Sequence, residues 1–220
     1  MNGRLSPYRN LGMVSPEYYP CPSDLPDHYV FTGFSHWHGP RDHAVAPEIA
    51  AFFDGGDAPV LVTLGTSAAS AAPAIFTLAA RALDRVGLRG LFLVSNDENA
   101  QRLGGRDGVW AFAPLSPLLE RCRAVVHSGA HGTNALVLEA GLPSVIVPQL
   151  FDQVWHAERV EQFGAGVHVR RASVTRLARA IDLVTREPRF GARAGEIAAQ
   201  LAAEDGPARA ADEIERFLAA

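Results

Sequence analysis

The stretch AVVHSGAHGTNALVLEAGLPSVIVPQLFDQ, residues 124–153, decides the fold of this chain. Its apolar start predicts a strand that ends at His127, a turn with two glycines comes next, and residues 133–140 have helical spacing that stops at Gly141. A second apolar strand, residues 144–148, leads directly to a carboxylate and a carboxamide. Strand, turn, helix and strand in this order predict part of an α/β fold with a parallel sheet.

The turn after the first strand has the features of an anion-binding site. The first N–H groups of a helix have no internal partner, and the helix dipole places partial positive charge there. Gly129 and Gly132 allow a close approach of the backbone, while His127 and Thr133 offer side-chain hydrogen bonds to phosphate oxygens. A plain strand-to-helix turn with a capping residue would explain the same residues, so the turn alone does not distinguish the two.

Two polar side chains after the second strand favour the binding site. Asp152 and Gln153 are expected at the same carboxyl edge of the sheet as the turn, which is where open α/β sheets bind ligands. A carboxylate beside a carboxamide accepts and donates several hydrogen bonds, as neighbouring hydroxyl groups on a sugar ring require. A diphosphate joined to a sugar therefore fits this edge.

Over residues 127–153 the chain resembles a known group, the glycosyltransferases of the GT-B fold. The resemblance is to the carboxyl-terminal, donor-binding half of UDP-glycosyltransferase-like enzymes, nearest to the bacterial branch of rhamnosyl-, sterol and antibiotic glycosyltransferases. The shared pattern is a His, a glycine-rich turn ending in Gly-Thr, then Ala-Gly-x-Pro, a strand ending in Pro, and Asp-Gln. Residues 60–66, VLVTLGT, and 112–114, FAP, resemble the opening strand and the base-stacking loop of that half.

The resemblance implies a role for each matching residue. Asp152 and Gln153 would bind the sugar, and Phe112 and Ala113 the nucleobase. The residues implied to bind the donor diphosphate are His127, Ser128, Gly129, Ala130, His131, Gly132, Thr133 and Thr66.

Some positions depart from the family pattern. His131 stands where a small or amidic residue is more usual, so its imidazole can either add a phosphate contact or crowd the diphosphate. The acid that many members use for the ribose is expected at Ala135 or Leu136, neither of which can serve, and Glu139 lies about one helical turn further on. Phe112 stands where many relatives have a Trp, and it can stack with less area.

The activity that the resemblance implies is inverting transfer of a sugar from a UDP- or dTDP-sugar to a hydroxyl group on a lipophilic small-molecule acceptor. The nucleotide sugar is a co-substrate, and neither a metal nor another cofactor is expected. The general base belongs to an acceptor-binding domain in that family, so no catalytic residue is expected in this chain. The alternatives left open are a non-catalytic nucleotide-sugar-binding partner subunit or sensor, and a site that has lost binding.

The order of segments predicts the fold class and the domains. Residues 1–58 are rich in Pro, Tyr and His and are expected to be an irregular linker or interdomain segment. Residues 59–220 are expected to form the nucleotide-sugar donor-binding domain, a Rossmann-like parallel sheet with helices on both faces and one half of a GT-B fold. The helix after the first strand should bury an apolar stripe. Its members are Ile75, Leu78, Ala82 and Val86.

Composition excludes several other classes. The net charge of −4 without a basic run predicts no nucleic-acid partner. Cys21 and Cys122 lack the spacing of a disulfide framework or zinc site. Every apolar run is too short for a transmembrane segment, and the amino terminus lacks the apolar core of a secretory signal, so a cytoplasmic location is expected.

Two further polar clusters are candidate ligand sites. His36, His38 and His43 lie close together beside Asp42, but in a loop without nearby Cys a structural role is favoured over a metal. The segment 96–99, NDEN, comes after a strand and is kept as a minor candidate beside ordinary turn chemistry. The motifs GxSxG and GxGxxG, which would indicate a serine hydrolase or a nicotinamide dehydrogenase, are absent from the sequence.

Overall fold

Two compact units make up the chain in the computed structural model, which describes residues 6–19, 22–35 and 45–219. The larger unit is His38–Ala198, and the smaller one combines Met1–Trp37 with Ala199–Ala220. In the described part of the chain, no helix has the length and apolar character needed to cross a membrane.

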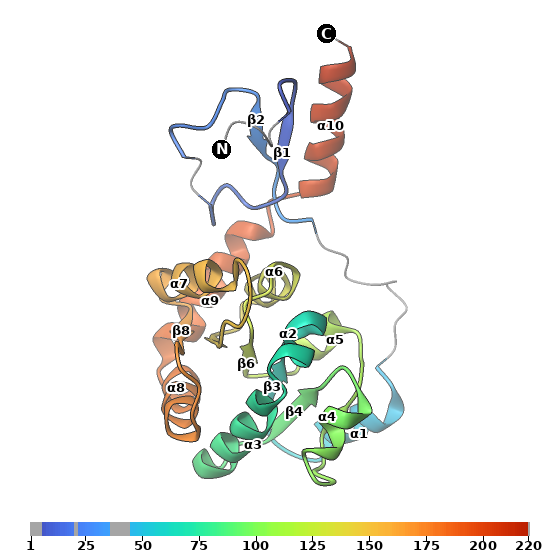
Figure 1. Ribbon diagram of the computed structural model, residues 1–220, viewed down its shortest axis with the longest axis vertical. Coiled ribbons are helices and arrows are strands. Elements are labelled where there is room, and N and C mark those ends of the chain that lie inside the picture. Colours follow the sequence, from blue (N-terminus) through green and yellow to red (C-terminus); the bar gives the residue numbers. More distant parts are fainter. Residues whose placement is uncertain (1–5, 20–21, 36–44, 220) are drawn as a thin grey trace. The chain divides into compact units, whose positions relative to one another are not determined.

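A six-stranded parallel sheet forms the centre of the larger unit (Figure 1). Its strand order is β5-β4-β3-β6-β7-β8, which confirms the expected parallel sheet. The strands are short and mostly apolar, as strands covered on both faces are. Their bounds are β3 Val60–Thr63, β4 Gly90–Leu93, β5 Val109–Trp110, β6 Ala124–His127, β7 Ser144–Ile146 and β8 Gly166–His168.

Helices cover both faces of this sheet, because successive side chains of a strand point to opposite faces and each face is apolar. Val62, Phe92 and Val126 pack in one core with α2, α3 and α8, while Leu61 and Val125 pack in the other with α1, α5 and α6. The helices of the larger unit are α1 Pro47–Asp54, α2 Gly65–Ala71, α3 Ala74–Val86, α4 Asp97–Gln101, α5 Leu115–Leu119, α6 His131–Glu139, α7 Gln153–Phe163, α8 Val174–Arg186 and α9 Pro188–Leu201, whose last residues belong to the smaller unit.

The segment after β3 forms two helices, α2 and α3, separated at Pro73. A proline has no N–H to continue a helix and clashes with the preceding turn, so the break is expected there. Ile75 and Ala82 are buried as predicted, whereas Leu78 and Val86 lie at the margin of the core. The predicted helix is therefore present, but its buried stripe is rotated from the predicted one.

The smaller unit joins the two ends of the sequence. Its strands β1 Asn10–Gly12 and β2 Tyr29–Phe31 pair in parallel, and its helix α10 spans Gly206–Leu218. Arg9 forms an ion pair with Glu213 on α10 at 2.5 Å, and the Ser15 hydroxyl donates to the Glu204 carboxylate at 2.6 Å. These two contacts link the amino-terminal residues to the carboxyl-terminal segment that contains α10.

The domain boundaries therefore differ from those expected from the sequence. Residues 1–58 hold β1, β2 and α1 rather than only irregular chain, and residues 199–220 group with the amino-terminal segment instead of the sheet. Strands of three residues and a helix of eight are too short to show periodicity in a sequence. Long-range contacts, which a sequence alone does not reveal, set the grouping.

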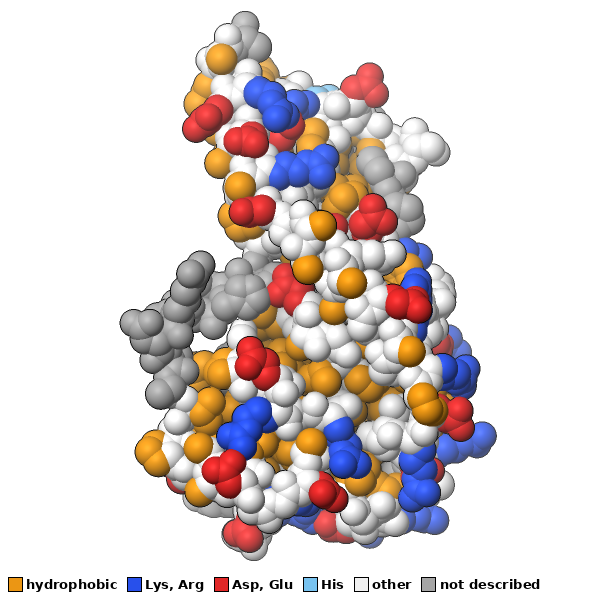
Figure 2. Space-filling view, turned by 180° about the vertical axis from the view of Figure 1, so that it is seen from behind, with side chains coloured by type: hydrophobic (Ala, Val, Ile, Leu, Met, Phe, Trp, Pro, Cys, Tyr) orange, Lys and Arg blue, Asp and Glu red, His pale blue; other side chains and the backbone are white. Residues whose placement is uncertain are grey.

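Acidic and basic side chains are mixed over the surface of the larger unit. In Figure 2 basic side chains are most frequent along one margin, with acidic and apolar side chains between them. The single described cysteine, Cys122, is buried, and burial raises the pKa of its thiol to about 12.

Candidate functional site

The predicted site lies where the direction of strand order reverses. From β3 the chain continues to β4 and β5 on one side, and it then returns to β6, β7 and β8 on the other side of β3. The helices after β3 and β6 thus leave toward opposite faces, and open α/β sheets usually bind ligands in a crevice outside the carboxyl ends of two such strands. The two turns identified from the sequence both lie at this edge of the sheet.

The turn after β3 and the turn after β6 are tied together. The Ser128 hydroxyl donates to the carbonyl oxygen of Leu64 at 2.8 Å. A methyl group built on Gly65 would lie 3.9 Å from both Ala130 Cβ and Thr133 Oγ1. The starts of α2 and α6 are therefore neighbours, and Thr66, which is exposed, belongs to the first turn of α2.

The start of α6 is open to an anion. Ala130 is its N-cap and has no side-chain oxygen to cap the helix, and the first internal bond runs from Asn134 N to Ala130 O at 2.8 Å. The N–H groups of Gly132 and Thr133 precede that bond and so have no acceptor within the helix. Gly132 is exposed, and a methyl group built on it would meet no atom within 4 Å. The direction in which a side chain at Gly132 would point is therefore open.

The other glycine of the turn has a different role. Gly129 has a φ of 87°, and a methyl group built on it would lie 2.9 Å from Ile146 Cγ2 and 3.1 Å from Gln153 O. Gly129 is thus required by the packing of the protein itself, because the turn passes directly against β7 and the start of α7.

The imidazole of His127 is completely buried under the turn. Its Nδ1 accepts the Gly129 N–H at 3.1 Å, so in the neutral ring the proton sits on Nε2. That Nε2 is buried and has no hydrogen-bond partner among the described residues. Burial, assisted by the nearby His156, lowers the pKa of His127 from 6.5 to about 3. His127 is therefore a neutral donor beneath the turn, and its ring does not reach the surface as a phosphate contact would require.

Asp152 and Gln153, the two predicted sugar-binding residues, differ in the exposure of their side chains. The side chain of Asp152 is 59% exposed. Gln153 is buried, and its Oε1 accepts the N–H groups of Gln149 and Leu150 at 2.8 and 3.0 Å. The Gln153 oxygen thus satisfies the backbone of the loop after β7, which leaves only its amide NH₂ group for a ligand. Together, the exposed Asp152 carboxylate and the Gln153 amide group still offer an acceptor and a donor, and sugar binding by them remains a prediction.

A residue that was not expected from the sequence lies behind Asp152. His156 has no exposed surface, its Nε2 lies 3.2 Å from Asp152 Oδ2, and its ring centroid is 5.5 Å from that of His131. Burial lowers the pKa of His156, and the Asp152 carboxylate partly opposes this effect. The spacing of four residues at the start of a helix was the signal that could have found this pair.

The remaining predicted residues lie on neighbouring loops. Phe112, between β5 and α5, is 83% exposed, whereas Ala113 beside it is buried. Glu139 lines a hollow of about 190 Å³ between α5 and α6, together with Ser116. The Asn96 side chain caps α4 by accepting the Asn99 N–H at 2.8 Å, so segment 96–99 has a structural role.

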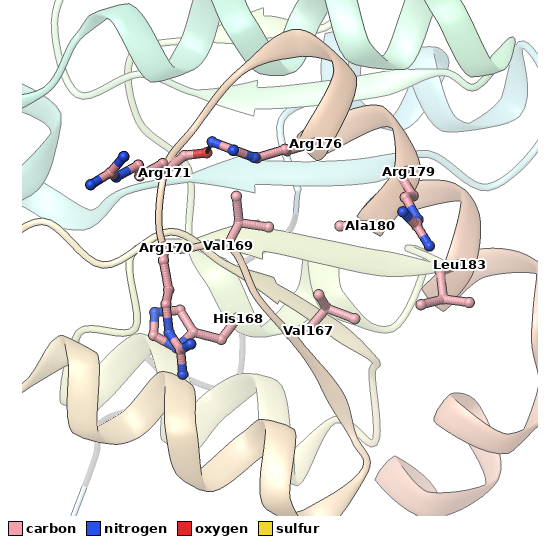
Figure 3. Close-up of a pocket in the computed structure, with 9 residues that line it drawn as sticks. All are labelled: Val167, His168, Val169, Arg170, Arg171, Arg176, Arg179, Ala180 and Leu183. Atoms are coloured by element: carbon pink, nitrogen blue, oxygen red, sulfur yellow. Dashed lines mark hydrogen bonds between the residues drawn. The ribbon is translucent and has the colours of Figure 1, made fainter.

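Another hollow, of about 530 Å³, lies between the edge strand β8 and α8 (Figure 3). Val167, Val169 and Leu183 form apolar walls, and the arginines around it belong to the β8–α8 loop and to α8. Among the described residues no three His, Cys, Asp or Glu side chains are placed to hold a metal ion. The tract from His36 to His43 lies outside the described residues.

Comparison with known proteins agrees with this architecture. Residues 95–217 match the model of the erythromycin biosynthesis protein CIII-like, C-terminal domain. O-mycaminosyltylonolide 6-deoxyallosyltransferase of Streptomyces fradiae is 32% identical over 98% of this chain, and a sterol 3-beta-glucosyltransferase of Yarrowia lipolytica is 29% identical over 93% of it. The chain spans only 53% of the first protein and 15% of the second.

Among solved structures, the spinosyn rhamnosyltransferase SpnG is similar in fold. It superposes with a TM-score of 0.78 at 22% identity, over 98% of this chain and 58% of SpnG. SpnG has also been solved in complex with thymidine diphosphate. The likeness confirms the expected fold, one half of the GT-B arrangement.

Proposed function

Because the chain belongs to the family of the erythromycin biosynthesis protein CIII-like, C-terminal domain, we propose that it is the donor-binding half of a nucleotide-sugar-dependent glycosyltransferase. The proposed reaction moves a sugar from a UDP- or dTDP-sugar to a hydroxyl group of a lipophilic acceptor, with inversion. The names of the two relatives, a deoxyallosyltransferase and a glucosyltransferase, support sugar transfer, and the thymidine diphosphate complex of SpnG supports the donor class.

The observation that carries the proposal is the open start of α6 at the point where strand order reverses. The N–H groups of Gly132 and Thr133, the Thr133 hydroxyl and the exposed Thr66 belong to the neighbouring starts of α6 and α2, and a methyl group built on Gly132 would meet no atom within 4 Å. A diphosphate in that space would face aligned N–H groups and the positive end of the helix dipole. As the bond to the sugar breaks, negative charge grows on the leaving diphosphate, and fixed donors of this kind stabilise it without having to reorganise.

The sugar would lie toward α7. The exposed Asp152 carboxylate can accept hydrogen bonds from two neighbouring hydroxyl groups, and the Gln153 amide group can donate one. Holding the sugar in one orientation exposes one face of its anomeric carbon to the acceptor, which is a positioning contribution to the rate. Phe112, on the β5–α5 loop, offers an exposed ring on which a base can stack.

His127 would support this site from the interior of the protein, by its hydrogen bond to the turn. Its neutral ring accepts the Gly129 N–H and thereby maintains the shape of the turn, while its Nε2–H is a buried donor without a partner among the described residues. The general base that takes the acceptor proton would be supplied by an acceptor-binding half or subunit. We therefore expect this chain alone to bind the donor nucleotide without rapid transfer.

Isothermal titration calorimetry with UDP and dTDP tests the donor site. The chain should bind at least one of them, and Gly132→Ala should weaken that binding by about tenfold or more, because the added methyl group fills only the space reserved for the diphosphate. The matched control is Ser67→Ala, an exposed position of α2 without an assigned contact, which should bind as the parent does.

Two results would contradict the proposal. A parent chain that binds neither nucleotide, or a Gly132→Ala variant that binds as tightly as the parent, would remove the diphosphate site from the start of α6. Rapid sugar transfer to an added alcohol by the purified chain would contradict the separate statement that the base lies outside it.

A further inference from the structure

The first turn of α7 contains a pair of side chains with opposite environments. The Asp152 carboxylate is 59% exposed, whereas His156, one helical turn later, has no exposed surface. The two side chains meet at 3.2 Å between Oδ2 and Nε2. A buried group thus contacts a carboxylate that is largely exposed.

Asp152 does not form the side-chain capping hydrogen bond that is usual at its position in a helix. It is the N-cap residue of α7, where an aspartate usually accepts a backbone N–H, yet it forms no side-chain cap. Its φ of −77° and ψ of −6° are helical, and these angles turn the side chain away from the helix end. The Asp152 carboxylate contacts the His156 imidazole instead of a backbone N–H group at the start of α7.

The His156 ring is held in one position by its neighbours. The His131 ring on α6 lies 5.5 Å away between centroids, and the Trp155 ring meets it edge-on at 5.6 Å. His127 on β6 is also close enough to influence it electrostatically. A fully buried side chain packed against two rings cannot change rotamer without opening a void, so its Nε2 stays at a fixed place.

The charge state of the pair suits a hydrogen-bond acceptor. The titratable groups near His156 are Asp152, His131 and His127, and burial outweighs the effect of the Asp152 carboxylate, so that the pKa of His156 is lowered. A neutral imidazole that donates through Nε2 orients a carboxylate without cancelling its charge. One oxygen of Asp152 is thereby fixed, and the remaining lone pairs stay available to hydroxyl groups.

We propose that His156 is a positioning residue that orients the Asp152 carboxylate for the hydroxyl groups of the donor sugar. The inference deepens the proposed function and depends on it. His156 then contributes to the affinity for the sugar and not to the affinity for the nucleotide, because it acts only through Asp152.

The test compares nucleotide with nucleotide sugar. The dissociation constants of UDP, dTDP, UDP-glucose and dTDP-glucose are measured by calorimetry, and the ratio of nucleotide to nucleotide-sugar constants gives the gain from the sugar. His156→Leu, of similar size but without a donor, should reduce this gain about tenfold and change nucleotide affinity less than about twofold. His156→Gln, whose amide nitrogen can reach the place of Nε2, should restore most of the gain.

A double-mutant cycle separates positioning from general damage. In an Asp152→Ala background, His156→Leu should cause no further loss of the gain from the sugar. Equal losses for nucleotide and nucleotide sugar, a further loss in the Asp152→Ala background, or a parent that gains nothing from the sugar would overturn the inference, while the nucleotide site would stand. A parent that binds neither nucleotide would overturn the proposed function and this inference together.

A second measurement covers the case in which His156→Leu does not fold. Nitrogen-15 spectra of the histidine rings should show the His156 proton on Nε2 in the parent at neutral pH. Asp152→Ala, a change at an exposed carboxylate, should shift that signal toward a mixture of tautomers. An unchanged His156 signal would contradict the contact on which the inference depends.

Discussion

Acidification should destabilise the larger unit through His127, by an amount set by the burial of its ring. Burial lowers the pKa of this ring from 6.5 to about 3 in the folded chain. Since the folded pKa is below the unfolded one, the unfolded state binds the proton first as the pH falls. The stabilising contribution is complete above about pH 6.5 and is lost progressively toward pH 3. Between about pH 7.5 and pH 5 the loss in unfolding free energy should be about 2 kcal/mol.

Urea unfolding at these two pH values measures the effect. His127→Asn cannot titrate, and its Oδ1 can accept the Gly129 N–H in place of Nδ1, so the variant should lose about 2 kcal/mol less than the parent on acidification. His28→Asn, at a partly exposed position of the smaller unit, is the matched control and should lose as much as the parent. Equal losses in the parent and in His127→Asn would refute the assignment of a buried neutral ring.

Three further substitutions test the packing of the site and core by urea unfolding. Gly129→Ala should lower the free energy of unfolding by at least about 2 kcal/mol, because a side chain is strained at the φ of this residue and would meet β7. Gly132→Ala should not lower it, and similar values for the two variants would contradict the different roles of the two glycines. Ser128→Ala should cost about 1–3 kcal/mol by leaving the Leu64 carbonyl unsatisfied, and no loss would show that the two turns are not tied together. Phe76→Ala, in a fully buried position, should cost about 3–5 kcal/mol, and a loss below about 1 kcal/mol would place Phe76 outside the core.

The sheet could be predicted from the sequence because each strand is a short apolar run before a turn and a periodic helix. β6, α6 and β7 were located to within about two residues. The smaller unit could not be predicted, because its strands are stabilised by a helix about 200 residues away in the sequence.

The positions of the candidate residues on strand ends and turns follow from the sequence pattern, whereas the orientations of their side chains could not be predicted. Sequence spacing put His127 at the end of a strand, and only packing shows that its ring turns inward. Likewise, the Gln153 oxygen is occupied by the two backbone N–H groups of a loop whose conformation no pattern specifies. His156 was missed because its role depends on the burial of its ring. The spacing of four residues from Asp152 indicates a contact between the two side chains, but it does not indicate burial.

The pairing of the chain's first segment with its last helix has a consequence for synthesis on the ribosome. Arg9 is synthesised 204 residues before Glu213, and Ser15 is synthesised 189 residues before Glu204, so the smaller unit cannot assemble until those later residues have been made. The larger unit is continuous in sequence and can fold first, and during its synthesis the amino-terminal strands would be exposed without their partner helix. A chaperone is therefore most expected to bind this chain during that interval.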